Sequence, residues 1–351
     1  MALIHLPQSK WMGGTGRQVI LKGDFEKIEQ AMVESFELLR SPSLEYVSAQ
    51  VVQVPATPDC KARVMLKGFP SPLHRGLFVD GGLSDGRYRE NATTVTLDFT
   101  QSTQIWGNVK VNQWYCVYAL AGASDSVFTL KAMPVMRVST QAAQVITLRN
   151  NPNSGDIGYG FAPDELAGAA LLVLTGPSRG LMRTISANNQ DNGTGGTITY
   201  GGSPLTLNQG DWFVVLPRAN FTYLGMVLKD DTGNLVPFCQ EGGTFRYHTY
   251  RSLAQGAING FTAFDLALVA PPTARLLSGY AAALNGYDLK LALSYDGNNP
   301  ALIIHGSPPA IELYGLRGAL PFSCLVPPGH RLYLDNNNTA HQVVRVTGWV
   351  E

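Results

Sequence analysis

The residues best placed to do chemistry in this sequence are Gly176-Pro177-Ser178-Arg179-Gly180, which match the Gly-x-Ser-x-Gly pattern of a hydrolase nucleophile. In that pattern a strand leads into the serine turn and a helix follows it. An apolar strand does precede the motif, but residues 181–185 are short, alternating and followed by an Asn-Gly loop, as in a hairpin. The segment therefore predicts a β-turn. A remote alternative keeps Ser178 as the nucleophile of an esterase or depolymerase.

The remaining polar motifs do not indicate a phosphate, metal or cofactor site. Gly13-Gly14-Thr15-Gly16-Arg17 lacks the preceding strand and the following lysine of a phosphate loop. The stretch from Asp80 to Gly86 lacks the alternating acids and the distal glutamate of a calcium loop. The six histidines show no metal-binding spacing. We expect no enzyme activity, no metal and no cofactor, although a pair of glycosidase carboxylates that meets only in the fold stays open.

Four cysteines lie far apart in the sequence and form no Cys-x-x-Cys pair, so they predict neither a zinc site nor a redox motif. We expect free and mostly buried thiols. The four are Cys60, Cys116, Cys239 and Cys324.

Aromatic residues beside turns are a second kind of candidate site, because aromatic rings pack on the faces of sugars. Most of them are expected in the core or at a subunit interface, since large rings contribute strongly to burial and are favoured in strands. The sequence does not select among them. The set comprises Tyr115, Tyr118, Trp212, Phe221, Tyr223, Tyr247, Tyr250, Tyr280, Tyr287, Tyr295 and Tyr333.

The composition limits the class of protein that can carry these residues. The 351 residues are 45% hydrophobic and 15% charged, with 26 basic and 26 acidic side chains and 37 glycines. This balance excludes a disordered chain and gives no basic surface for nucleic acid. The longest apolar run, residues 169–174, is far shorter than the ~20 residues that span a bilayer, and the start shows no signal peptide. We expect no membrane insertion.

One segment predicts a helix. Asp24 can act as N-cap, and an apolar stripe with spacings of three and four follows it before Ser41-Pro42 ends the helix. A helix this short needs a partner surface. The partner is either the next domain of the same chain or other copies in a short parallel coiled coil. The stripe, our candidate for oligomerisation or attachment, consists of Phe25, Ile28, Met32, Phe36 and Leu39.

The rest of the chain predicts short antiparallel strands separated by turns rich in glycine, asparagine and proline. The pattern is typical of a mainly β protein with sandwich or barrel domains. We expect an N-terminal arm and helix at 1–45, a β-rich central region at 46–250 and a C-terminal β-sandwich at 251–351, with a polar separating segment at 246–260. The clearest strand candidates are 93–99, 114–120, 127–130, 145–148, 171–174, 181–185, 197–200, 212–216, 288–293, 301–304, 310–314, 331–334 and 343–349.

Two segments resemble parts of known proteins. Residues 172–189, LVLTGPSRGLMRTISANN, resemble a strand-turn-strand element that recurs in bacteriophage tail and fibre proteins. Residues 221–247 are similar to a segment of phage tail-fibre proteins. There a tyrosine and a glycine precede an apolar strand, an Asp-x-x-Gly-Asn turn, a Pro-Phe pair and a Gln-Gly stretch. Here these are Tyr223, Gly225, Asp231 to Asn234, Pro237-Phe238 and Gln240 to Gly242.

Downstream segments resemble the C-terminal β-domain of the same phage proteins. They are residues 264–275, 325–328 and 344–350, so the resemblance covers about 165–351, while 46–165 match nothing comparable. The order of these motifs is more specific than any one of them.

The resemblance implies a structural protein of the virion, of the tail-fibre type and assembled as a homotrimer. Such a protein is made in the host bacterial cytoplasm, whose reducing environment agrees with free cysteines. One hypothesis has the N-terminal segment attach to other virion proteins and residues 251–351 bind a host-surface glycan or protein. The alternative is an adaptor, collar or decoration protein that joins other virion proteins and has no receptor role.

Overall fold

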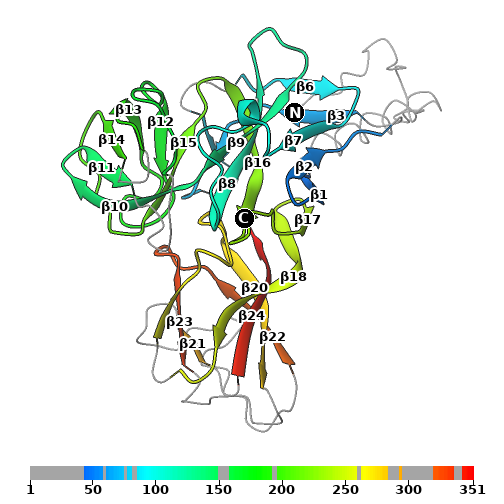
Figure 1. Cartoon of the computed structure of the whole chain (residues 1–351), viewed down its shortest axis with the longest axis vertical. Coiled ribbons are helices and arrows are strands. Elements are labelled where there is room, and N and C mark those ends of the chain that lie inside the picture. Colours follow the sequence, from blue (N-terminus) through cyan, green and yellow to red (C-terminus); the bar gives the residue numbers. More distant parts are fainter. Residues whose placement is uncertain are drawn as a thin grey trace, which may run out of the picture. The chain divides into compact units, whose positions relative to one another are not determined.

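The computed structural model describes residues 43–57, 61–74, 77–80, 85–148, 158–191, 196–258, 262–283, 292–294, 319–335 and 342–351. Residues from Pro42 to Glu351 form one unit. The expected helix with Phe25, Ile28, Met32, Phe36 and Leu39 lies outside the described residues, so its role stays a prediction. Within the described part the chain is mainly β, as the turn-rich sequence predicted, and its paired strands are antiparallel (Figure 1).

Small sheets begin the described chain. β1 (Glu45–Ser48), β2 (Val51–Val54) and β7 (Val95–Asp98) form a three-stranded sheet. Two pairs accompany it: β3 (Ala62–Met65) with β6 (Tyr88–Asn91), and β4 (Phe69–Pro70) with β5 (Phe78–Val79). A 3-10 turn, η2, follows at Ser102–Gln104.

A central three-stranded sheet has the order β16-β8-β9. Its strands are β8 (Gln113–Ala121), β9 (Thr129–Pro134) and β16 (Asn220–Lys229). Almost every residue of β8 is buried, because this aromatic and β-branched strand has a neighbour on each side and is covered on both faces. The sheet is therefore a buried support for the parts around it.

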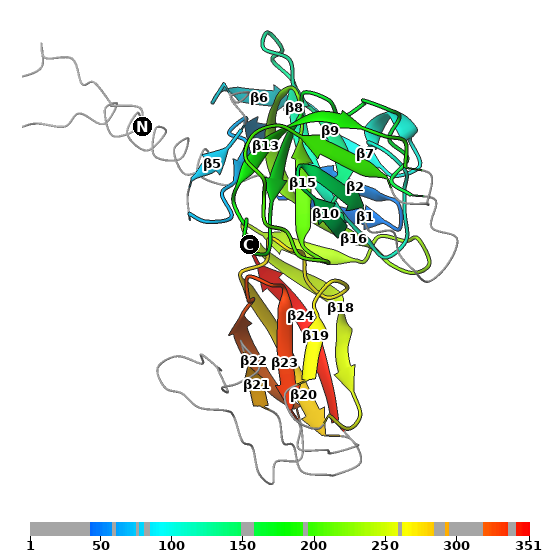
Figure 2. The same cartoon turned by 90° about the vertical axis from the view of Figure 1, so that its left-hand side faces the viewer.

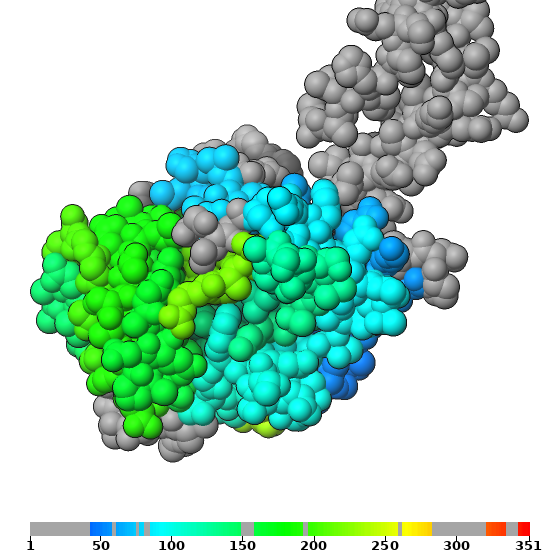
Figure 3. All heavy atoms as spheres, turned by 90° about the horizontal axis from the view of Figure 1, so that it is seen from above, coloured from blue at the N-terminus to red at the C-terminus, as the bar shows by residue number. Residues whose placement is uncertain are grey.

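A closed barrel of six strands follows, in the order β10-β11-β14-β13-β12-β15. The strands are β10 (Met136–Ala142), β11 (Val145–Leu148), β12 (Ala170–Val173), β13 (Met182–Asn188), β14 (Thr197–Tyr200) and β15 (Trp212–Leu216). β15 closes the barrel by pairing with both β12 and β10. Alternation fills the interior, as in β14, where Ile198 and Tyr200 are buried and the two threonines are half-buried. Figure 3 shows the barrel, in green, packed beside the cyan segment before it.

The C-terminal part contains two antiparallel sheets that lie against each other (Figure 2). The larger has the order β17-β18-β24-β20-β22 and the smaller β19-β23-β21. Their bounds are β17 (Phe238–Glu241), β18 (Thr244–Gln255), β19 (Thr262–Asp265), β20 (Leu276–Ala283), β21 (Ala292–Ser294), β22 (Ala319–Leu325), β23 (Arg331–Asp335) and β24 (Gln342–Val350). We call these two sheets together the C-terminal sandwich; the larger one begins at Phe238, ahead of residue 251, where the sequence predicts the domain to start.

The segment between the central and C-terminal parts differs from expectation. Residues 246–255 were expected to be a polar separating segment, but they form most of β18. The expected boundary after residue 250 falls inside this strand. The reason is that β18 is exposed on one face, so its polar residues face solvent while Phe245, Tyr247 and Ala254 are buried. Polar composition here reflects a half-exposed strand.

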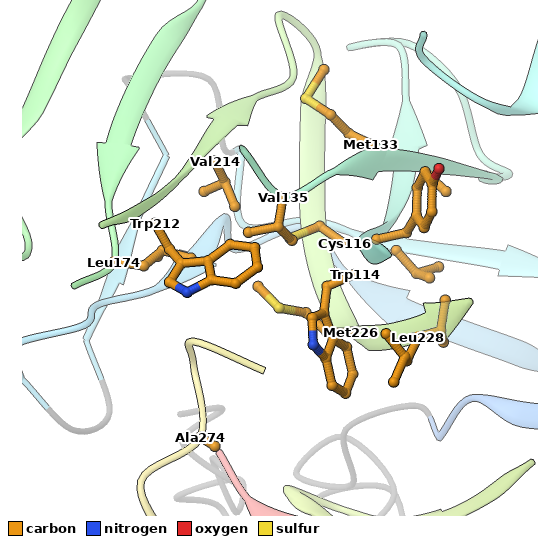
Figure 4. Packing of buried hydrophobic residues seen from close by; sticks show 14 of the residues in the cluster. Trp114, Cys116, Met133, Val135, Leu174, Trp212, Val214, Met226, Leu228 and Ala274 are labelled. Atoms are coloured by element: carbon orange, nitrogen blue, oxygen red, sulfur yellow. The ribbon is translucent and has the colours of Figure 1, made fainter. Parts of the chain in front are cut away.

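The buried residues form one continuous core that joins these parts. Figure 4 shows Trp212, Val214 and Leu174 of the barrel side in the same cluster as Trp114 and other residues of the central sheet. Trp114 also contacts Trp349 of β24 edge to face, with ring centroids 5.5 Å apart. Aromatic packing therefore joins the central sheet to the C-terminal sandwich.

Candidate functional site

Ser178 lies in the turn of a β-hairpin. The turn joins β12 to β13, with the Gly180 N–H donating to the Val173 carbonyl at 2.8 Å. Ser178 is 4% exposed, and its Oγ accepts a hydrogen bond from the Thr206 N–H at 2.7 Å. A strand rather than a helix follows the motif, so the predicted hairpin is confirmed. The Ser178 hydroxyl therefore holds the loop that contains Thr206. A hydrolase serine lies instead on an exposed turn between a strand and a helix, which this hairpin lacks.

The described histidines and cysteines divide into buried and exposed positions, with His74 and His248 exposed. His330 is buried, its Nε2 lies 3.1 Å from the Pro271 carbonyl, and burial lowers the pKa of His330 to about 4. Cys116 and Cys324 are buried and Cys239 is exposed, and all three are free. Burial raises the pKa of Cys324 to about 12, which keeps this thiol protonated and unreactive. No group of three metal-ligating side chains occurs in the part of the chain that the structure describes.

A second ionisable group with a shifted pKa, the half-buried Glu351, lies where the sandwich meets the central sheet. Glu351 follows β24, and its carboxylate accepts hydrogen bonds from the Tyr223 and Thr273 hydroxyls, each at 2.8 Å. Burial raises the pKa of Glu351 to about 7 despite these bonds. Arg275 lies near and donates to the Ser71 carbonyl at 3.0 Å. The cluster connects three segments of the chain and is a structural junction.

The aromatic residues that the sequence offered as candidate sugar contacts differ in their exposure to solvent. Tyr250 is 44% exposed, which distinguishes it from every other described member of that set. Tyr223, Tyr280 and Tyr333 are half-buried. Five members are buried in the core: Tyr115, Tyr118, Trp212, Phe221 and Tyr247. Tyr287 and Tyr295 lie outside the described residues.

The exposed ring belongs to a three-residue group on the outer face of the five-stranded sheet, which we call the Tyr-Arg surface: Tyr250, Tyr280 and Arg345. The Arg345 guanidinium carbon lies 3.8 Å from the centroid of the Tyr250 ring. Tyr250 and Tyr280 meet edge to face, with centroids 5.9 Å apart. The arrangement is therefore a cation-π pair with a second ring at its edge.

Strand register places these three side chains together. Arg345 of β24 pairs with Ser252 of β18 on one side and with Tyr280 of β20 on the other. The register between β18 and β24 shifts between Arg246 and Arg251, so β18 carries extra residues there. Tyr250 lies in this irregular stretch, and bulges of this kind re-aim side chains. The bulge therefore places an exposed ring beside a regular row of the sheet.

The Tyr-Arg surface carries positive charge that no described carboxylate pairs with. Arg345 makes no salt bridge to any residue that the structure describes, and its Nε is buried without a hydrogen-bond partner. Arg246 is exposed and pairs with Gly348 of β24, three positions along that strand from Arg345. Glu241 of β17 pairs with Thr244, which in turn pairs with Val350, five positions from Arg345 along β24. The surface therefore offers an unpaired cation beside an aromatic platform.

Arg345 was missed by our sequence analysis. Residues 344–347 alternate between buried and half-buried, and Val344 and Val346 on either side of Arg345 are buried. That alternation could have placed the arginine on the outer face. Its meeting with Tyr250 depends on the register of three strands and on a bulge, which no spacing in the sequence encodes.

Neither a family model nor a curated protein nor a solved structure matches this chain. Among the residues that the structure describes, no helix is long and apolar enough to cross a membrane. The function is therefore argued from the motifs and from the geometry of the chain itself.

Proposed function

We propose that this chain is a structural protein of a bacteriophage virion, of the fibre type, which assembles as a homotrimer and contacts the host surface through its C-terminal sandwich. The observation that carries the proposal is the order of the phage-like motifs along residues 165–351. The first lies on the β12–β13 hairpin of the barrel, and the later ones lie on the central sheet and the sandwich. Charge-poor, turn-rich β structure agrees with a part that is used in several copies.

Assembly is tested by the mass of the full chain in solution. Light scattering coupled to gel filtration should give three times the 37.9 kDa chain mass. Replacing Ile28 and Met32 by aspartate should convert the trimer to monomer if the expected helix stripe joins the copies. The matched control replaces Glu29 and Glu34, on the charged side of that helix, by glutamine. A wild-type monomer would contradict the trimer, and a trimer that survives both aspartates would contradict the role of the helix.

Host contact is tested by competition. An excess of the purified full-length protein should reduce adsorption of the parent phage to its bacterium, because free protein occupies the receptor. Truncation at residue 251 is unsuited to this test, since it would cut through β18. Unchanged adsorption at a saturating concentration of the protein would contradict the receptor role and favour the adaptor, collar or decoration alternative.

A further inference from the structure

We propose that the Tyr-Arg surface binds a carboxylated glycan, a sugar chain of the uronic-acid type. The proposal rests on the proposed function, because it assigns the ligand class to the sandwich that contacts the host. It is carried by three side chains from three neighbouring strands, Tyr250 of β18, Arg345 of β24 and Tyr280 of β20.

The aromatic half of the surface fits a sugar ring. Tyr250 is 44% exposed although its ring already contacts Arg345 and Tyr280. A free tyrosine ring with two rotatable bonds offers a rigid, amphipathic contact at low entropic cost. The apolar C–H face of a pyranose can lie on such a ring while its hydroxyls face water. The phenol oxygens at the ring edges supply polar contacts beside it.

The cationic half requires a negative charge on the ligand. The Arg345 guanidinium has no carboxylate partner among the described residues, and stacking on Tyr250 holds it in place. A stacked guanidinium keeps its edge N–H groups available, and these match a carboxylate in a bidentate pair. A neutral glycan would leave this charge unused.

The charge balance favours a carboxylate over a phosphate. One guanidinium lies at the ring platform, and Arg246 lies opposite Gly348, three positions from Arg345 along β24. A carboxylate carries a single charge that one guanidinium neutralises, whereas a phosphate monoester carries about 1.5 to 2 charges at neutral pH. Glu241, which pairs with Thr244 two positions from Arg246 on β18, opposes accumulation of further negative charge there.

The test measures binding of the full chain to polygalacturonate oligosaccharides by calorimetry, with carboxyl-reduced oligosaccharides and dextran as matched neutral ligands. Arg345→Gln should weaken binding to the acidic oligosaccharide by at least about tenfold, since it removes a charge-assisted bidentate contact. Arg345→Lys should recover only part of this loss, because lysine keeps the charge without the planar fork. Tyr250→Ala should also weaken binding about tenfold. Arg246→Gln, exposed on the same face, should change affinity less than twofold.

The outcomes separate this proposal from the proposed function. Binding to the acidic oligosaccharide that Arg345→Gln weakens by at least about tenfold, in a variant with unchanged melting temperature, supports it. Equal binding of the carboxyl-reduced form would overturn the carboxylate assignment. Displacement of the acidic oligosaccharide by inorganic phosphate, at a concentration at which chloride displaces none of it, would overturn it too. No binding of the wild-type chain to the acidic oligosaccharide would overturn it as well. If that chain still blocks phage adsorption, the receptor role stands and only the ligand class is wrong.

Discussion

The barrel and the C-terminal sandwich differ in how their sheets end. Every strand of the barrel has a hydrogen-bonded neighbour on both sides, whereas the large sheet of the sandwich ends at β17 and β22. Closure leaves no row of unpaired N–H and C=O groups for another chain to pair with. The barrel therefore has no edge strand, whereas the large sheet of the sandwich has two edge strands and a face exposed to solvent.

The two regions also use their polar residues differently. In the barrel, buried polar side chains bind loop N–H groups: Asn188 accepts from Leu166, Asp191 from Tyr159 and Asp211 from Asn208. In the sandwich, Arg345 lies on the outer face without a carboxylate partner among the described residues. Polar groups of the barrel are engaged in holding its own loops. Those of the sandwich face are available to a ligand, which is why we place recognition there.

The largest expected effect comes from removing the aromatic link of the sandwich. Trp349 is 2% exposed, stacks on Phe245 with centroids 4.8 Å apart and contacts Trp114. Trp349→Ala should lower the free energy of unfolding by about 3–5 kcal/mol, because a large cavity forms in the core. Hydrogen exchange of the full chain should show lost protection in β18, β20 and β24.

The matched barrel variant is Phe213→Ala, which removes a fully buried ring of β15. It should cost a similar free energy, with the lost protection concentrated in β10, β12 and β15. If both variants lowered protection equally throughout the chain, the barrel and the sandwich would unfold as one cooperative unit. That result would contradict the view that the barrel is a unit of stability separate from the sandwich.

The next effect compares two glycines of hairpin turns. Gly176, at the barrel turn, has a φ of +80°, and a Cβ there would overlap the Asp211 carboxylate. Gly242, between β17 and β18, has a φ of +59° with open space around it. Gly176→Ala should cost about 2–4 kcal/mol, from backbone strain and overpacking together, and Gly242→Ala about 1–2 kcal/mol from strain alone. Urea denaturation measures both, and equal losses would show that the barrel turn relaxes freely.

These hairpins illustrate what the sequence predicted well. Alternating residues such as Thr197–Tyr200, with turn residues between them, predicted five of the six barrel strands, because burial of one side of each strand fixes the pattern. The sixth, β10 at Met136–Ala142, was not among the predicted strands. The β-turn at Ser178 followed from the short strand after it. Local patterns of this kind depend on neighbours in the chain and can be read from it.

The candidate site could not be predicted in the same way. Its residues, Tyr250, Tyr280 and Arg345, are separated by 30 and 65 positions in the sequence and meet through sheet register. The polar segment around 246–255 was misread because a strand exposed on one face has the composition of a loop. Long-range pairing and solvent exposure are properties of the fold, so local spacing carries no signal for them.

A smaller effect concerns the pH dependence of the sandwich junction. Burial raises the pKa of Glu351 from 4.5 to about 7, so the folded chain binds this proton more tightly than the unfolded chain. The free energy of unfolding should therefore fall as the pH rises from 4.5 to about 7. Glu351→Gln should remove this part of the slope while keeping an acceptor for Tyr223 and Thr273. Unfolding midpoints at several pH values measure it, and an unchanged slope in the variant would refute the assignment.

The smallest effect concerns an ion pair between the barrel and the sandwich. Arg137 of β10 donates to Asp265 of β19 at 2.6 Å, and Arg137 also stacks on Trp212. Burial raises the pKa of Asp265, but the charge and hydrogen bond of Arg137 outweigh this and lower it overall. Because the Asp265 side chain is 40% exposed, Asp265→Asn should cost only about 0–1 kcal/mol.

Asparagine is the informative replacement because it removes the charge and keeps an oxygen for the Ala267 N–H, which now donates to Asp265 at 2.9 Å. The loss should shrink further in 1 M salt, where exposed charges are screened. Urea titrations at low and high salt measure it, with Glu90→Gln, which breaks the surface pairs to Lys61 and Arg63, as the control. A salt-independent loss above 2 kcal/mol would mean that this pair, rather than the packing of Trp349 on Trp114, is what fixes the sandwich to the rest of the chain.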